Sequence, residues 1–175
     1  GVKTGLAWTS AGGEILFIET SFTKGSGKII ITGQLGDVMK ESAQIAITLV
    51  KKRYPDKADL FKENDLHIHV PAGAVPKDGP SAGITMATAM LSAVLNKPVR
   101  ADVAMTGEIT LRGRVLPIGG LKEKLLAAKG AGMKTVIVPE RNRRDVEELS
   151  REITGGLELV YAQNMNDVIS HAFVQ

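Results

Sequence analysis

Residues 76–95 read Pro-Lys-Asp-Gly-Pro-Ser-Ala-Gly-Ile-Thr-Met-Ala-Thr-Ala-Met-Leu-Ser-Ala-Val-Leu, a loop rich in proline and glycine that runs into an apolar helix. The prolines and glycines between residues 71 and 80 predict the loop. The helix over residues 81–95 is apolar on nearly every side, so we expect it to be largely buried. Strand-like sequence lies before this segment at residues 66–70 and after it at residues 103–106. The segment therefore opens an alternation of strands and helices in the second half of the chain.

The remaining elements complete a mixed α/β (α+β) fold, which we interpret as a single domain over residues 1–175. Early strands are predicted at 2–8, 14–22 and 28–32, with turns at 11–13 and 24–27, and they look like hairpins. Apolar residues then recur at helical spacing over 37–53, until Tyr54-Pro55-Asp56 ends the helix. Further strands are expected at 108–111, 115–118, 135–138 and 157–161, and further helices at 121–131, 144–153 and 165–173.

Composition excludes several kinds of site. The 175 residues contain no cysteine, which removes disulfides, cysteine nucleophiles and thiolate metal sites. A net charge of +3 is too mild to indicate a nucleic-acid or membrane surface, and we interpret Arg141, Arg143 and Arg144 as a solvated helix start. No apolar run reaches the roughly 18 residues of a spanning helix. Because the chain begins with Gly1, we interpret it as a piece of something longer.

Ser81 is the candidate nucleophile. Gly79 lets the backbone turn, and Pro80 fixes φ just before the serine. At the start of the predicted helix, Ser81 would lie beside unpaired N–H groups and the positive end of the helix dipole, which favour the negative charge of an oxyanion. Serines at helix starts are also common N-caps, and the residues alone favour that interpretation.

A nucleophilic serine needs a base, and the chain has three histidines. His67 and His69 alternate with Ile68, so they share one face of a strand, where they could bind a metal or serve Ser81. No third metal ligand lies at a recognisable spacing, and a polar strand face is the favoured interpretation. His171 lies in the last predicted helix, where we expect it at the surface.

Two lysines of the helix 121–131 differ in helical position. At about 100° per residue, Lys124 lies beside Ala128 on a face of small apolar residues, whereas Lys122 lies beside Lys129. A lysine among alanines can be partly buried, and burial lowers the pKa of its ammonium towards that of a useful base. A snorkelling lysine on the flank of a helix is the alternative, and the spacing alone does not decide between them.

Residues 24–29, Lys-Gly-Ser-Gly-Lys-Ile, resemble a phosphate-binding loop only faintly. The first glycine of that motif and the Ser or Thr after the lysine are missing, and no helix pattern follows. We interpret the segment as a flexible hairpin turn. No other ATP-binding sequence is found, so we expect no cofactor in this chain.

Six blocks of sequence resemble the Lon protease family. They follow the family's order and spacing over nearly the whole chain, at residues 5–9, 32–42, 67–71, 76–83, 105–111 and 116–124. The string Pro-Lys-Asp-Gly-Pro-Ser-Ala-Gly is highly specific on its own. The resemblance implies the Lon proteolytic-domain fold and a serine endopeptidase in which Ser81 is the nucleophile and Lys124 the general base. A serine–histidine hydrolase and a non-enzymatic assembly domain are the alternatives.

The resemblance also implies supporting residues. Thr106 matches the position whose hydroxyl holds the lysine amine in such enzymes, and Asp78 matches a loop residue that we expect to shape the active-site loop without joining a triad. The paired histidines belong to the family pattern but not to its dyad. No metal is implied.

In Lon-like enzymes this domain follows an ATPase module that unfolds and threads polypeptide substrates, and the whole works as a ring, commonly a hexamer. The resemblance therefore implies three partners: polypeptide substrates, copies of the same chain, and an N-terminal ATPase module of the parent chain. ATP and Mg²⁺ would be cofactors of that module. The bacterial type fits best, which implies protein quality control in the cytoplasm, or in the mitochondrial matrix for a eukaryotic relative.

Overall fold

The computed structural model describes residues 3–71 and 77–174. It has a seven-stranded sheet in the order β3-β4-β2-β1-β5-β8-β9, and β6 and β7 form a separate antiparallel pair. In the large sheet, β2 is antiparallel to both of its neighbours, and the other pairs are parallel. The strands are β1 Lys3–Ala11, β2 Glu14–Lys24, β3 Ile29–Thr32, β4 Asn64–His69, β5 Val103–Met105, β6 Glu108–Ile109, β7 Val115–Leu116, β8 Thr135–Pro139 and β9 Glu158–Ala162. The expected mixed α/β class is confirmed.

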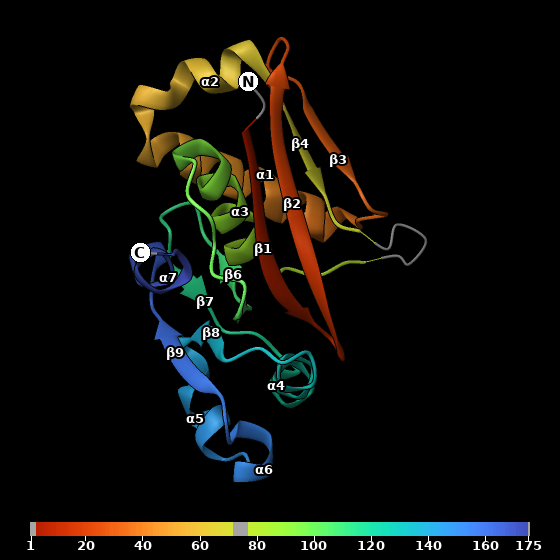
Figure 1. Ribbon diagram of the computed structural model, residues 1–175, viewed down its shortest axis with the longest axis vertical. Coiled ribbons are helices and arrows are strands. Elements are labelled where there is room, and N and C mark those ends of the chain that lie inside the picture. Colours follow the sequence, from red (N-terminus) through yellow and green to blue (C-terminus); the bar gives the residue numbers. More distant parts are fainter. Residues whose placement is uncertain (1–2, 72–76, 175) are drawn as a thin grey trace.

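The first expected hairpin is present, and the second is replaced by another pairing. β1 and β2 pair from Lys3↔Phe22 to Ala11↔Glu14. β3 does not pair with β2, because β4 lies between them, antiparallel to β2 and parallel to β3. Parallel strands need a crossover connection rather than a tight turn. That crossover consists of α1 (Asp37–Arg53), the short η1 (Pro55–Lys57) and α2 (Ala58–Glu63), as Figure 1 shows.

Helices cover the two faces of the sheet unequally. α3 (Gly83–Leu95) packs against β1 and β2, α1 packs against α3, and both lie behind the sheet in Figure 1. On the opposite face, α4 (Leu121–Gly130) and α5 (Arg143–Glu147) join a smaller core with β5 and β8. The parallel strands β5 and β8 are therefore buried on both faces, as parallel strands usually are. α4 also contacts β1 and β2 near their hairpin, and the rest of the front of β1, β2 and β4 carries no helix in Figure 1.

Several helices differ from the prediction at their ends. The helix over 37–53 is confirmed, but α3 begins at Gly83 rather than at Ser81. The single helix expected over 144–153 is two, α5 and α6 (Arg151–Thr154), because Ser150 has an extended backbone and interrupts the helical path. The remaining elements are η2 (Glu140–Asn142) and α7 (Met165–Ala172).

Candidate active site

A cavity of about 490 Å³ opens where distant parts of the chain meet. Its walls are the tip of the β1–β2 hairpin, segment 77–82 before α3, segment 117–119 before α4, and the first turn of α4. Of the residues predicted for the site, Ser81, Lys124 and Asp78 line this cavity together, and Thr106 does not line it.

Ser81 lies in the turn just before α3 and is half-buried. The N-cap of α3 is Ala82, and no side chain caps the helix, so the N-cap interpretation of Ser81 is wrong. The backbone around Ser81 is fixed from the side: the Gly107 N–H donates to the Ser81 carbonyl (2.7 Å), and the Gly107 carbonyl accepts from the Ile84 N–H (3.1 Å). The Ser81 side chain therefore does not cap α3, and its backbone is held in place by the hydrogen bond from Gly107.

Asp78 fastens the loop before Ser81 to the start of α1. Its Oδ1 accepts a hydrogen bond from the Met39 N–H (3.0 Å), and such bonds to backbone N–H groups lower the pKa of Asp78. The loop packs so closely that a Cβ on Gly36 would lie 2.3 Å from the Asp78 carboxyl carbon. Gly79 follows with φ of +113°, a conformation that other residues rarely adopt. Pro76, the first residue of the family string, lies outside the described residues.

Lys124 is buried on the inner side of α4. The residue is 7% exposed, whereas Lys122 is exposed, so the buried lysine is the observed one of the two alternatives that the helical spacing left open. Burial lowers the pKa of Lys124, because the ammonium form loses hydration. Within residues 3–71 and 77–174, neither the Lys124 amine nor the Ser81 hydroxyl makes a hydrogen bond, so the two groups line one cavity without a hydrogen bond between them.

Thr106 follows β5 and precedes Gly107, the residue that anchors the Ser81 turn. Its side chain is fully buried, and its hydroxyl has no hydrogen-bond partner among the described residues. An unpaired buried hydroxyl is costly to the fold. The expected bond from this hydroxyl to the lysine amine is not formed in this structure.

Lys77 is a second buried lysine of the cavity, which the sequence analysis missed. Its Nζ donates to the Gly33 carbonyl (2.7 Å). Burial lowers the pKa of Lys77, and the charge of Glu14 at the hairpin tip opposes that shift. Lys77 lies in a loop, where no helical spacing indicates burial, so the sequence carried no signal for it.

The sequence profile of the Lon protease (S16) C-terminal proteolytic domain matches residues 1–175. The chain belongs to the Lon protease family. It is 61% identical over 177 residues to a Lon protease of Lachnoclostridium phytofermentans, and this match covers 99% of the chain and 22% of the relative. It is 55% identical to a Lon protease of Geobacter metallireducens (98% of the chain, 21% of the relative) and 58% identical to Lon protease 4 of Sorangium cellulosum (98% and 22%).

The chain thus spans about a fifth of the length of these Lon proteases. The family profile that matches the chain is that of the proteolytic domain, so family membership makes the chain a peptidase domain. None of the helices in the described part of the chain is long and apolar enough to cross a membrane.

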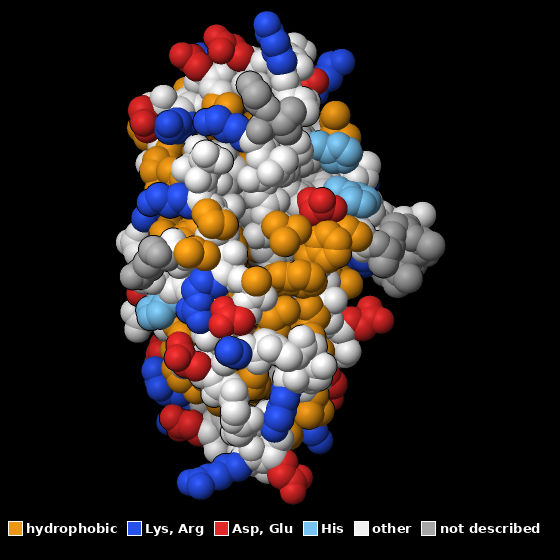
Figure 2. All heavy atoms as spheres, in the orientation of Figure 1, with side chains coloured by type: hydrophobic (Ala, Val, Ile, Leu, Met, Phe, Trp, Pro, Cys, Tyr) orange, Lys and Arg blue, Asp and Glu red, His pale blue; other side chains and the backbone are white. Residues whose placement is uncertain are grey.

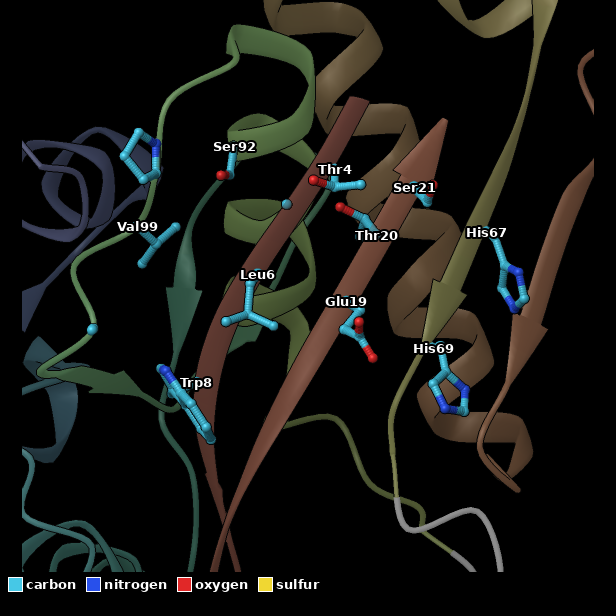
Figure 3. Close-up of a pocket in the computed structure, with 13 residues that line it drawn as sticks. Thr4, Leu6, Trp8, Glu19, Thr20, Ser21, His67, His69, Ser92 and Val99 are labelled. Carbon is cyan, nitrogen blue, oxygen red and sulfur yellow. The ribbon is translucent and has the colours of Figure 1, made fainter. Parts of the chain in front are cut away.

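The paired histidines of this Lon-family chain lie away from Ser81. Together with Leu6 and Trp8, they line a different cavity of about 680 Å³ on the part of the sheet's front that no helix covers (Figure 3). This second cavity shares no lining residue with the Ser81 cavity. Figure 2 shows hydrophobic side chains gathered on this face near the histidines. Thr32 Oγ1 lies 2.8 Å from His67 Nε2 and 2.6 Å from His69 Nδ1. No cluster of three metal-binding side chains is present among the described residues.

The segment that faintly resembles a phosphate loop is held by a carboxylate. Asp65 Oδ1 accepts from the N–H groups of Ser26 (3.0 Å) and Lys28 (2.9 Å). These are the backbone donors with which such a loop would hold a phosphate. His171, the third histidine, is exposed on α7, as expected.

Proposed function

We propose that the chain hydrolyses peptide bonds through a serine–lysine dyad, with Ser81 as nucleophile and Lys124 as general base. The observation that carries the proposal is that both line one cavity, while burial lowers the pKa of Lys124. A neutral amine at moderate pH can take a proton from a serine, which an ordinary ammonium cannot. Membership of the Lon family supports the reaction class.

The reaction proceeds through an acyl-enzyme. Lys124 Nζ accepts the hydroxyl proton as Ser81 Oγ bonds to the scissile carbonyl carbon, and an electron pair moves onto the carbonyl oxygen. The tetrahedral intermediate then re-forms the carbonyl and breaks the C–N bond, and the leaving amine takes the proton from Lys124. Water attacks the ester, its proton passes through Lys124 to Ser81 Oγ, and the acid product is released.

Two features of the site suit these reaction steps. Neither the Ser81 nor the Ala82 backbone N–H donates a hydrogen bond within the described residues, so both are available to an oxyanion. The Lys124 amine is not yet in hydrogen-bond contact with Ser81, and catalytic contacts of this kind often tighten only when substrate binds. Thr106, with its unpaired hydroxyl, is the group that would orient the amine as it moves, and Asp78 holds the loop.

The competing hydrolase has less support. A serine–histidine enzyme would need His67 or His69 near Ser81, and both line the other cavity. Lys77 is the stronger rival as a base, because it also lies in the Ser81 cavity and burial lowers its pKa. However, its amine is already bonded to the Gly33 carbonyl, and the nearby Glu14 charge favours its ammonium form.

At the scale of the parent protein, the proposal follows the family. The domain would receive unfolded polypeptides from an N-terminal ATPase module, which uses ATP and Mg²⁺, inside a homo-oligomeric ring, which in Lon-like enzymes is commonly a hexamer. Such a protease would serve protein quality control in the cytoplasm. The support is the match of this chain to about a fifth of longer Lon proteases.

A covalent probe tests the nucleophile directly. A fluorophosphonate should modify Ser81, as located by mass spectrometry of the digested chain, and should leave Ser81→Ala unmodified. The variant should stay folded, because Ser81 caps no helix. Labelling of a different serine, or hydrolysis of a peptide at the wild-type rate by folded Ser81→Ala, would overturn the assignment.

A further inference from the structure

Asn142 is a buried residue whose side-chain amide forms hydrogen bonds with a loop that is distant in sequence. It is 2% exposed at the end of η2. Its Oδ1 accepts from the Ile118 N–H (2.9 Å), and its Nδ2 donates to the Ile118 carbonyl (2.9 Å). Both backbone groups of one residue are thus held by one amide, as in a β-ladder pair.

The residue that Asn142 holds forms a wall of the Ser81 cavity. Ile118 lines the cavity between its neighbours Pro117 and Gly119, and Lys124 lines it on the first turn of the following helix. Ile118 also packs against the small core that contains Leu121 of α4. Within the described residues, segment 117–119 has no other hydrogen bonds than the pair from Asn142.

Asn142 is itself held rigidly. Its Nδ2 also donates to Asp145 Oδ2 (2.8 Å), so both ends of the amide are occupied. In the same turn, Arg143 pairs with Glu140 (2.8 Å) and lies over the ring of Tyr161 in β9, 3.8 Å from its centroid. The clamp on Ile118 is therefore tied to the edge of the sheet.

We propose that Asn142 is a positioning residue for peptide hydrolysis, which holds segment 117–119 in place as the wall that keeps water from the Lys124 amine. The inference rests on the proposed dyad. It needs only the geometry of the clamp and of the cavity: when the two bonds to Ile118 are lost, the segment can move away from α4 and admit water. A hydrated ammonium is stabilised, so Lys124 would hold its proton to higher pH.

The charged groups that share the cavity with Lys124 are Glu14 on the β2 side and Lys77 and Asp78 on the Ser81 loop. α5 and α6 also pack against α4, and none of their described side chains lines the cavity. Substitution of Asn142 changes none of these charges, so a shift in the pH dependence would report hydration of Lys124.

The test is the pH profile of kcat/KM for one fluorogenic peptide with Asn142→Ala. We expect a loss of up to about 100-fold at neutral pH, the order of cost of a misplaced catalytic group, and a rising limb displaced to higher pH. Ile118→Ala, which thins the same wall but keeps the clamp, should displace the limb in the same direction. If Asn142→Ala does not fold, Asn142→Ser, which is also uncharged and too short to bind both backbone groups of Ile118, takes its place with a displacement in the same direction.

Asn164→Ala is the matched control. Asn164 caps α7 through its own side chain, accepting from the Asp167 N–H, and lies outside the cavity, so its loss destabilises a helix without touching segment 117–119. An unchanged limb in Asn142→Ala, or an equal displacement in Asn164→Ala, would overturn the inference. Failure of the dyad itself is distinguishable, because folded Lys124→Ala would then remain active.

Discussion

Lys124 is a buried residue on a helix whose other two lysines, Lys122 and Lys129, are exposed. Desolvation is the cause of its lowered pKa, and no acidic side chain opposes it. The same burial that prepares a base is costly to the fold, because the folded state must either strip water from an ammonium or give up its proton. This cost gives a test that does not depend on activity.

Lys124→Met should make the fold more stable at neutral pH. The folded pKa lies below the unfolded one, so between them the unfolded state binds more protons and wild-type stability rises with pH. The gain of the variant should therefore be largest below the folded pKa and vanish above the ordinary lysine value of about 10.4. Denaturant melts across pH measure it. Lys122→Met, at an exposed position, should show no such pH-dependent gain; a similar gain there would contradict the burial argument.

Thr106→Val should separate stability from activity. Valine matches the shape of threonine and removes a buried hydroxyl that has no described partner, so the free energy of unfolding should rise by about 1 kcal/mol. Hydrolysis should fall, though less than on loss of Lys124, because an orienting group is lost and the base remains. Thr85→Val is the control, since Thr85 on α3 has the same kind of unpaired buried hydroxyl. Equal activity in the two variants would exclude a special contribution of Thr106.

Helical spacing placed Lys124 on a face of small apolar residues but left open whether it is buried or snorkels, and no pattern indicated the burial of Lys77 in a loop. It was wrong on Ser81 as an N-cap, since the helix starts two residues later and leaves the serine in a turn. The catalytic assignments of Ser81, Lys124, Thr106 and Asp78 stay predictions.

Elements with a strong local pattern were predicted well. The amphipathic helix α1 begins and ends where its apolar spacing does. The break between α5 and α6 was missed, because the apolar spacing continues across Ser150 although the backbone there is extended and not helical. The contact between segment 77–80 and the start of α1 could not be predicted from local sequence patterns, because Asp78 and Met39 are far apart in sequence.

Asp78→Ala should loosen this junction of loop and helix. The Met39 N–H loses its acceptor, so we expect a lower melting temperature and a loss of hydrolysis of up to about 100-fold through misplacement of Ser81. Asp78→Asn keeps an oxygen in place and should retain more of both. Thermal melting and peptide hydrolysis of the two variants measure this. If Asp78→Ala matched the wild type in both assays, the loop would not depend on the contact.

The whole molecule brings together parts that no local pattern connects. The cavity needs the tip of the β1–β2 hairpin, the turn before α3 and the start of α4 to meet. The mixed fold class followed from the sequence, but the strand order did not: β4 inserts between β2 and β3 after a long crossover, and such pairing depends on tertiary packing.

The isolated chain should hydrolyse short unstructured peptides slowly, at the same rate with and without ATP. The backbone donors of the segment that resembles a phosphate loop are already bonded to Asp65. A stably folded protein should resist cleavage, and the same protein after permanent unfolding should be cut. Rates with and without ATP and Mg²⁺ measure this. Stimulation by ATP in a preparation free of other ATPases would contradict the account.

The central claim is that Lys124 is the base for Ser81, and the most direct measurement compares its two helix neighbours across pH. One fluorogenic peptide is hydrolysed by the folded wild type, Lys122→Ala and Lys124→Ala. The account predicts a wild-type rate that rises with pH through a pKa below the ordinary lysine value, because burial lowers the pKa of Lys124. It also predicts a nearly unchanged profile for Lys122→Ala and almost no hydrolysis for Lys124→Ala. Equal losses in the two variants, or a larger loss at Lys122, would contradict it.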